Sequence, residues 1–72
     1  MIICDLHPNF NDLSFHDPQH PETTLGMAYA YGEEVYMLLY DSKGISFADI
    51  EIIMDGWNQM QEIRKEMLAN LD

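Results

Sequence analysis

Apolar residues in the last third of the chain recur with the spacing of an amphipathic α-helix. They fall at positions 50, 53, 54, 57, 60, 67, 68 and 71, a period that places side chains on one helix face. Ser46 precedes this run, and Asp49 lies three residues after Ser46. This is the capping-box spacing, with Asp in place of Glu. The pattern predicts a helix over residues 46–71.

Two residues conflict with a single straight helix. Gly56 lies in its interior, where glycine costs about 1 kcal/mol relative to alanine. Arg64 would point out of the middle of the apolar stripe. Two alternatives follow. The helix is continuous, or it kinks or splits around residues 55–57, which rotates the side chains of its second half relative to those of the first.

Two β-rich runs precede the helix. Residues 27–31 alternate methionine or tyrosine with alanine, residues 32–34 contain glycine, and residues 35–40 form a second run. This order predicts a β-hairpin over residues 25–42. The second run is apolar or aromatic at every position, so we expect both of its faces to be covered. One helix covers one face, which leaves Tyr36, Leu38 and Tyr40 for the N-terminal arm or for a second subunit.

The first 24 residues contain all three prolines and all three histidines. Residues 2–6 are apolar enough for a short strand, a possible third strand of the sheet. From His7 onward, prolines, asparagines and aspartates predict an irregular arm with turns, anchored on the body by Phe10, Leu13 and Phe15. The predicted fold class is α+β: a small antiparallel sheet packed on a C-terminal helix, in one domain over residues 1–72.

Acidic residues dominate the charge of the chain. Thirteen Asp and Glu stand against Lys43, Arg64 and Lys65, for a net charge of −10. This charge repels nucleic acid and anionic membranes and favours basic protein partners. The apolar content is too high for a disordered acidic tail. A surface charge that serves only solubility is the alternative interpretation.

A chain of 72 residues is close to the lower size limit for a self-sufficient core. Such domains usually depend on disulfides, a metal or a second subunit. Cys4 is the only cysteine, so no disulfide forms within the chain, and a lone thiol suits a reducing compartment. Neither a signal peptide nor a bilayer-spanning apolar run is recognisable. We therefore expect a cytoplasmic homodimer.

Potential metal ligands and nucleophiles do not form a recognised motif. The ligand types in the N-terminal region are Cys4, Asp5, His7, His16, Asp17 and His20. Pro18 separates His16 from His20 and opposes a shared helix, and the spacings match no structural zinc pattern. No strained nucleophile turn or glycine-rich phosphate loop is present in the sequence. We expect no metal, no cofactor and no catalytic activity, with a small metal-binding or catalytic domain as the alternative.

Four carboxylates project onto the side of the predicted helix opposite its apolar face. Glu51, Asp55, Glu62 and Glu66 span about 22 Å along the axis. A solvated helix face explains this row structurally. The functional explanation is a row of fixed negative charge that imitates a phosphate backbone and competes for a basic DNA-binding groove.

The segment KGISFADIEII, residues 43–53, resembles the central motif of the small dimeric uracil-DNA glycosylase inhibitors encoded by phages. That pattern is Lys-Gly-aliphatic-Ser-apolar-small-Asp-apolar-Glu-aliphatic-aliphatic. The identical positions are Lys43, Gly44, Ser46, Asp49 and Glu51. Without a gap, the family's acidic hairpin falls on residues 27–41 and its C-terminal helix on residues 57–71, so the resemblance covers about two-thirds of the chain. Residues 1–24 have no counterpart.

The resemblance implies a DNA mimic that binds host uracil-DNA glycosylase. Such enzymes flip the target base out of the duplex, and an apolar wedge holds a distorted base step open. Carried over by position, Ile50 and Met54 line a pocket for the wedge residue and Glu51 serves a rim that meets the phosphate-binding groove. The family has aromatic residues where this chain has Ile50 and Met54.

Together with the helical spacing, the resemblance predicts three sets of site residues. The pocket consists of Ile50, Ile53, Met54 and Trp57. The acidic rim consists of Asp49, Glu51, Asp55, Glu62 and Glu66, with a purely capping role as the alternative for Asp49. The dimer interface consists of Tyr36, Leu38 and Tyr40. The alternative functions are inhibition of another nucleic-acid enzyme, such as a restriction or CRISPR nuclease, and an acidic antitoxin-like binding module.

Overall fold

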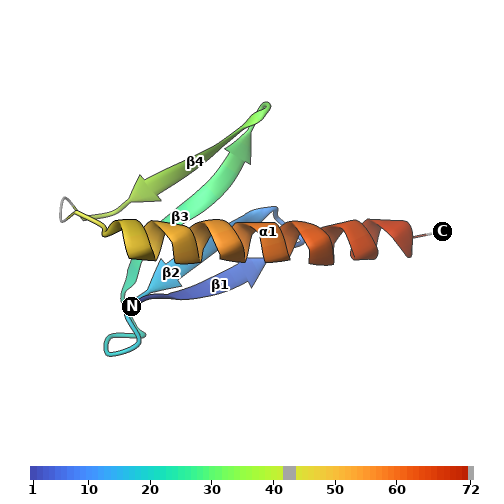
Figure 1. Cartoon of the computed structure of the whole chain (residues 1–72). Helices are drawn as coiled ribbons and strands as arrows, with labels where there is room; N and C mark the ends of the chain where they lie inside the picture. Colours follow the sequence, from blue (N-terminus) through green and yellow to red (C-terminus); the bar gives the residue numbers. More distant parts are fainter. Residues whose placement is uncertain (42–43, 72) are drawn as a thin grey trace.

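The computed structural model describes residues 1–41 and 44–71. These residues form a four-stranded antiparallel sheet in the order β1-β2-β3-β4 and a C-terminal helix (Figure 1). The elements are β1 (Ile3–His7), β2 (Asp12–His16), β3 (Thr24–Tyr31), β4 (Glu34–Leu39) and α1 (Phe47–Ala69). The predicted α+β class is confirmed. Ser42 and Lys43, at the predicted junction of hairpin and helix, lie outside the described residues.

The N-terminal region is largely strand, and the prediction of an irregular arm over residues 7–24 is wrong for Asp12–His16, which form β2. The third strand predicted near residues 2–6 is present as β1, and β2 pairs with β1 on one side and β3 on the other. Leu13 and Phe15 of β2 are fully buried, because alternate residues of a strand face the same side. Residues 17–23 are irregular, as expected. Phe10, predicted as an anchor, is 79% exposed in the β1–β2 turn.

The predicted hairpin is confirmed as β3 and β4. Tyr31 pairs with Glu34, so the turn consists of Gly32 and Glu33, and Glu34 begins β4 rather than belonging to the loop. Gly32 has a φ of +65°, a left-handed conformation that glycine adopts without steric cost. The two-residue turn fixes the register, which places Ala28 opposite Met37 and Tyr29 opposite Tyr36.

The helix is continuous from Phe47 to Ala69, so the alternative of a break around residues 55–57 is wrong. Ser46 is the N-cap, and its Oγ accepts a hydrogen bond of 3.1 Å from the backbone N–H of Asp49. Gly56 lies where α1 packs against β1: a Cβ there would be 3.3 Å from Cys4 Sγ. Glycine is therefore present for close packing rather than for a kink.

Arg64 is accommodated without a kink or break in the helix. Its Nη1 donates to the Pro8 carbonyl oxygen at 2.6 Å, and Gln61 Nε2 donates to Asn11 Oδ1 at 2.7 Å. Both acceptors belong to the turn between β1 and β2. These bonds tie the second half of α1 to the sheet and give the guanidinium a polar partner on the apolar side of the helix.

The helix covers only half of the sheet. It packs on β1 and β2, and the β3–β4 hairpin extends away from it (Figure 1). The buried core is correspondingly small: Ile2, Leu13, Phe15, Ala28, Ile53 and Met60. A helix about 10 Å in diameter spans roughly two strands spaced about 4.8 Å apart. Consequently the expectation that α1 buries one face of β4 is wrong, and the residues of β4 from Glu34 to Leu38 are exposed.

Candidate functional site

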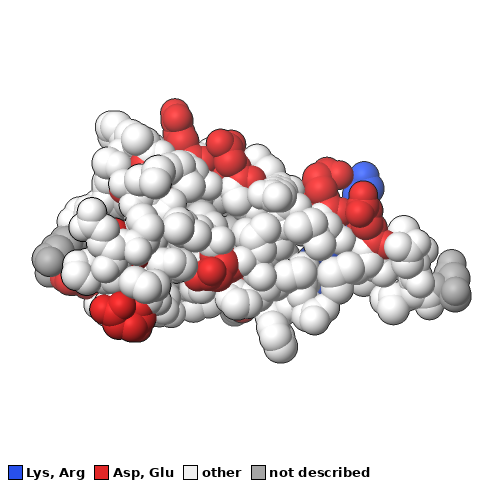
Figure 2. Space-filling view, turned by 90° about the horizontal axis from the view of Figure 1, so that it is seen from below, with Lys and Arg blue, Asp and Glu red and all other residues white. Residues whose placement is uncertain are grey.

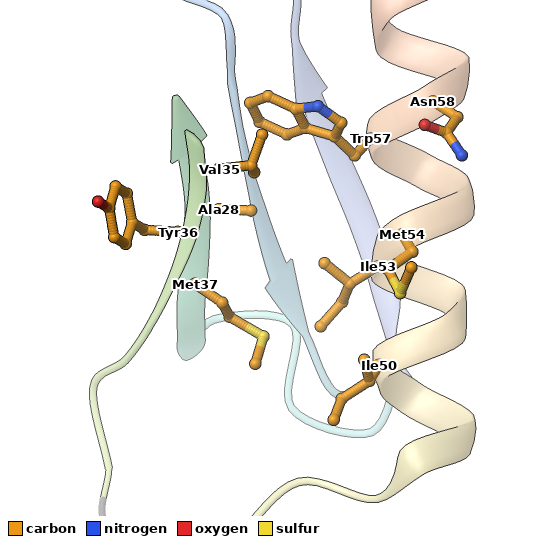
Figure 3. Close-up of a pocket in the computed structure, with 9 residues that line it drawn as sticks. All are labelled: Ala28, Val35, Tyr36, Met37, Ile50, Ile53, Met54, Trp57 and Asn58. Atoms are coloured by element: carbon orange, nitrogen blue, oxygen red, sulfur yellow. The ribbon is translucent and has the colours of Figure 1, made fainter. Parts of the chain in front are cut away.

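An open apolar pocket of about 320 Å³ lies between α1 and β4. Figure 3 shows its walls, which come from β3, β4 and α1. The lining residues are Ala28, Val35, Tyr36, Met37, Ile50, Ile53, Met54, Trp57 and Asn58. The pocket exists because α1 is seated over β1 and β2, which leaves the inner face of β4 uncovered.

The structure brings together all four residues predicted from the helix to line a pocket. Ile50, Ile53, Met54 and Trp57 follow the spacing i, i+3, i+4, i+7 and therefore share one helix face. Their environments differ: Ile53 is buried in the core, whereas Met54 is 59% exposed at the mouth. The floor of the pocket is thus part of the core, and its mouth is accessible to solvent.

The sheet wall of the pocket was missed from the sequence. Val35 and Met37 are two positions apart on β4 and face the same side, and Met37 is paired with Ala28 of β3. The signal was the absence of polar residues on either face of this strand. Tyr36 also borders the pocket, although Figure 3 shows its ring on the opposite side of β4.

Four of the five predicted rim acids lie on the exposed side of α1. Glu51, Asp55, Glu62 and Glu66 are all exposed. At about 100° per residue, Glu51 is about 60° and Glu62 about 80° around the helix from Met54. From Ile53, on the floor of the pocket, the four acids lie about 140–180° around the helix. The acidic row therefore lies on the side of α1 opposite the pocket floor, and Glu51 comes nearest to the mouth. In Figure 2, which shows one face of the molecule, acidic side chains form separate groups on a surface of mostly other residues.

Asp49, the fifth predicted rim acid, is placed differently. It lies about 140° around the helix from Met54, and its Oδ1 is 3.7 Å from the Met1 amino nitrogen, with only 20% of the side chain exposed. It borders a second cavity of about 400 Å³ whose walls include Ile2 and Phe15. Its backbone N–H completes the Ser46 cap, so its position matches the capping role.

The three residues predicted for a dimer interface lie at the edge of the sheet. Tyr36, Leu38 and Tyr40 are all exposed. The alternation along β4 puts Tyr36 and Leu38 on the face away from α1, and Tyr40 directly follows the strand. The ring of Tyr36 stacks on that of Tyr29 at a centroid distance of 5.8 Å. This outer face of the hairpin is therefore aromatic and uncovered in the single chain.

The histidines make local contacts within the first hairpin and the loop after it. His16 Nδ1 is 2.8 Å from Asp5 Oδ2, His7 Nε2 is 3.3 Å from Ser14 Oγ, and His20 Nδ1 is 3.8 Å from Glu22 Oε1. Within residues 1–41 and 44–71, no three His, Cys, Asp or Glu side chains are grouped to hold a metal ion. Burial, and secondarily the Asp5 carboxylate, raises the pKa of the Cys4 thiol above its ordinary value.

Across the described ranges, no helix combines the length and apolar character needed to cross a bilayer. Comparison of the chain with protein-family models, curated proteins and solved structures finds no match. The functional argument therefore rests on the pocket, the acidic row on the same helix and the uncovered strand β4.

Proposed function

We propose that this chain is an acidic DNA mimic that inhibits a host uracil-DNA glycosylase, in the manner of the phage inhibitors that residues 43–53 resemble. The observation that supports this function best is the apolar pocket between α1 and β4, lined by Ile50, Ile53, Met54 and Trp57, with exposed carboxylates elsewhere on the same helix. The chain acts by binding and is not itself an enzyme.

The acidic row supplies the electrostatic half of the mechanism. From Glu51 to Glu66 it extends about 22 Å, which corresponds to about six base pairs of duplex at about 3.4 Å each. A glycosylase binds its substrate through a basic groove that contacts phosphates. The row occupies that groove, and the net charge of −10 accelerates the encounter through long-range attraction.

The pocket supplies the apolar half of the mechanism. A base-flipping enzyme inserts an apolar side chain into the duplex, and that side chain is exposed once DNA is absent. Burying a side chain of the size of Leu or Phe contributes about 1.5–3 kcal/mol. The pocket accepts this residue while the carboxylates meet the groove, so one helix serves both contacts.

A second copy of the chain completes the assembly. Among residues 1–41 and 44–71, the sheet ends at β4, whose outer edge pairs with no other strand of this part of the chain and whose outward residues, Tyr36 and Leu38, are exposed. An exposed apolar edge strand of this kind associates unless it is protected by charge or proline. Dimerisation through Tyr36, Leu38 and Tyr40 covers the hairpin and stabilises a domain with a small core.

Uracil excision from an oligonucleotide tests the function directly. We expect stoichiometric inhibition by the native chain and at least tenfold weaker inhibition by Glu51→Lys. Glu22→Lys is the matched control, because Glu22 is an exposed acid in the loop before β3 and undergoes the same charge change. Equal loss in both variants would indicate general attraction rather than a rim on α1.

Absence of inhibition at high excess, with glycosylases from several hosts, would overturn the proposal. Capture of a restriction or CRISPR nuclease from host lysate would then favour inhibition of that enzyme, and capture of a basic toxin would favour an antitoxin-like module. If a chelator or His16→Ala abolished the inhibition of uracil excision, a metal-dependent domain would be favoured instead. Inhibition by a DNA mimic is unaffected by either.

A further inference from the structure

Two methionines form opposite parts of the pocket wall. Met37 extends from β4 towards the helix, and Met54 lies on α1 (Figure 3). Met37 is 38% exposed and Met54 59% exposed, so both residues are accessible to reagents in solution. Met60, one helical turn and a half further along α1, is fully buried in the core and provides an internal reference.

A methionine thioether reacts with hydrogen peroxide in a balanced two-electron step. A sulfur lone pair attacks one peroxide oxygen, the O–O bond breaks, and the products are a sulfoxide and one water molecule. Sulfur is oxidised and the peroxide is reduced. The product is polar and disrupts apolar surfaces rich in methionine, and methionine sulfoxide reductases reverse it, one enzyme for each epimer.

We propose that Met37 and Met54 are oxidation sites that regulate the pocket, with peroxides as the reactive class. This inference rests on the proposed function, because it requires an apolar side chain of a partner to enter the pocket. Once that side chain excludes water, a sulfoxide oxygen on either wall loses its hydrogen bonds to solvent, which is unfavourable for a buried polar group. Oxidation therefore closes the site, and reduction reopens it.

Occupancy and oxidation oppose each other. A partner side chain in the pocket covers Met54 and Met37 and shields them from peroxide, whereas Met67, which lies near the C-terminal end of α1 and borders a different cavity, keeps its exposure. The pattern of protection thus identifies the pocket as the occupied surface without any substitution in the chain.

The test treats the full chain with dilute hydrogen peroxide and follows each methionine by peptide mass spectrometry. We expect Met37 and Met54 to oxidise several-fold faster than Met60, and glycosylase inhibition to weaken at least tenfold. Both sulfoxide reductases with a dithiol reductant should restore inhibition. Addition of glycosylase before peroxide should slow oxidation at Met37 and Met54 but not at Met67.

Substitutions separate the pocket from other oxidised positions. The double variant Met37→Leu, Met54→Leu should be unaffected by peroxide relative to its own untreated sample, whereas Met67→Leu should remain as sensitive as the native chain. Equal peroxide sensitivity in the double variant would overturn the proposal, and so would full inhibition by a native chain oxidised at both positions.

Failure of the proposed function is distinguishable from failure of this inference. If the untreated chain inhibits no glycosylase, binding of the neutral apolar dye Nile red reports the pocket instead. Loss of dye fluorescence on oxidation of the native chain, but not of the double variant, supports oxidation control of the pocket. Unchanged fluorescence contradicts it.

Discussion

Arg64 Nη1 donates a hydrogen bond of 2.6 Å to the carbonyl oxygen of Pro8, which joins the second half of α1 to the turn between β1 and β2. With the bond from Gln61 to Asn11, this contact holds the helix over the first two strands. That position of the helix is the reason why β4 stays uncovered and the pocket exists.

Replacement of Arg64 tests this link. Arg64→Met keeps most of the side-chain volume but leaves the Pro8 carbonyl without its partner, and we expect the free energy of unfolding to fall by about 1.5–3 kcal/mol, as for other hydrogen bonds to charged groups. Urea denaturation measures the change. The exposed neighbour Lys65 is the control, since Lys65→Met should stay within about 0.5 kcal/mol of the native chain. Equal effects would contradict the link.

Gly56 and Cys4 form a coupled pair. An alanine at a helix interior is normally about 1 kcal/mol more favourable than glycine, but here its Cβ would lie 3.3 Å from Cys4 Sγ. We expect Gly56→Ala to stabilise a Cys4→Ala chain more than the native chain, by about 0.5–1.5 kcal/mol. Thermal or urea unfolding of the four chains completes the cycle. If the stability effects of the two substitutions added, Gly56 and Cys4 would not be coupled.

The two halves of the proposed site should differ in their kinetics. Removal of a rim charge changes the association rate and its salt dependence, whereas loss of a buried apolar contact changes dissociation. We expect Glu51→Lys to slow association with the glycosylase about tenfold at low salt, and Met54→Ser to accelerate dissociation by a similar factor. Surface plasmon resonance at two ionic strengths separates the rates. The reverse assignment would contradict the mechanism.

Self-association should depend on the outer face of β4. We expect Leu38→Glu to weaken dimerisation at least tenfold, because it places a charge in an apolar contact. Phe10→Glu is the matched control, since Phe10 is an exposed aromatic residue of the other hairpin. Because the protomers carry like charge, added salt should strengthen the native dimer. If sedimentation equilibrium found a monomer at all salt concentrations, the proposed dimer would be refuted.

The environment of Cys4 should appear in the pH dependence of stability. Burial, and then Asp5, raises the pKa of this thiol above its ordinary value. Above pH 9.0, the ordinary value, the unfolded chain has lost this proton while the folded chain retains it, so stability falls as pH rises. We expect urea unfolding of the native chain to lose more free energy between about pH 8 and about pH 10 than Cys4→Ala does. Identical slopes would contradict the assignment.

Local signals in the sequence predicted the elements that local physics controls. Ser46 and Asp49 lie three residues apart and form the cap with no help from the rest of the fold. The apolar period after them predicted α1 to within two residues at its C-terminal end. Gly32 marked the hairpin turn, because glycine adopts its positive φ without steric cost.

The elements that were mispredicted depend on partners distant in the chain. Strand β2 is five residues long and flanked by turn-forming residues, so its own sequence argued for a loop, and pairing with β1 and β3 decided its conformation. Gly56 and Arg64 suggested a break because their compensating contacts, Cys4 and Pro8, lie about fifty residues earlier.

The helical face of the candidate site, Ile50, Ile53, Met54 and Trp57, was determined by the sequence, because a period of 3.6 residues fixes which side chains share a face. Whether that face meets a closed core or an open pocket was decided only by the tertiary structure. The contacts of Gly56, Gln61 and Arg64 seat α1 over β1 and β2, and a single helix is too narrow to reach β4 as well.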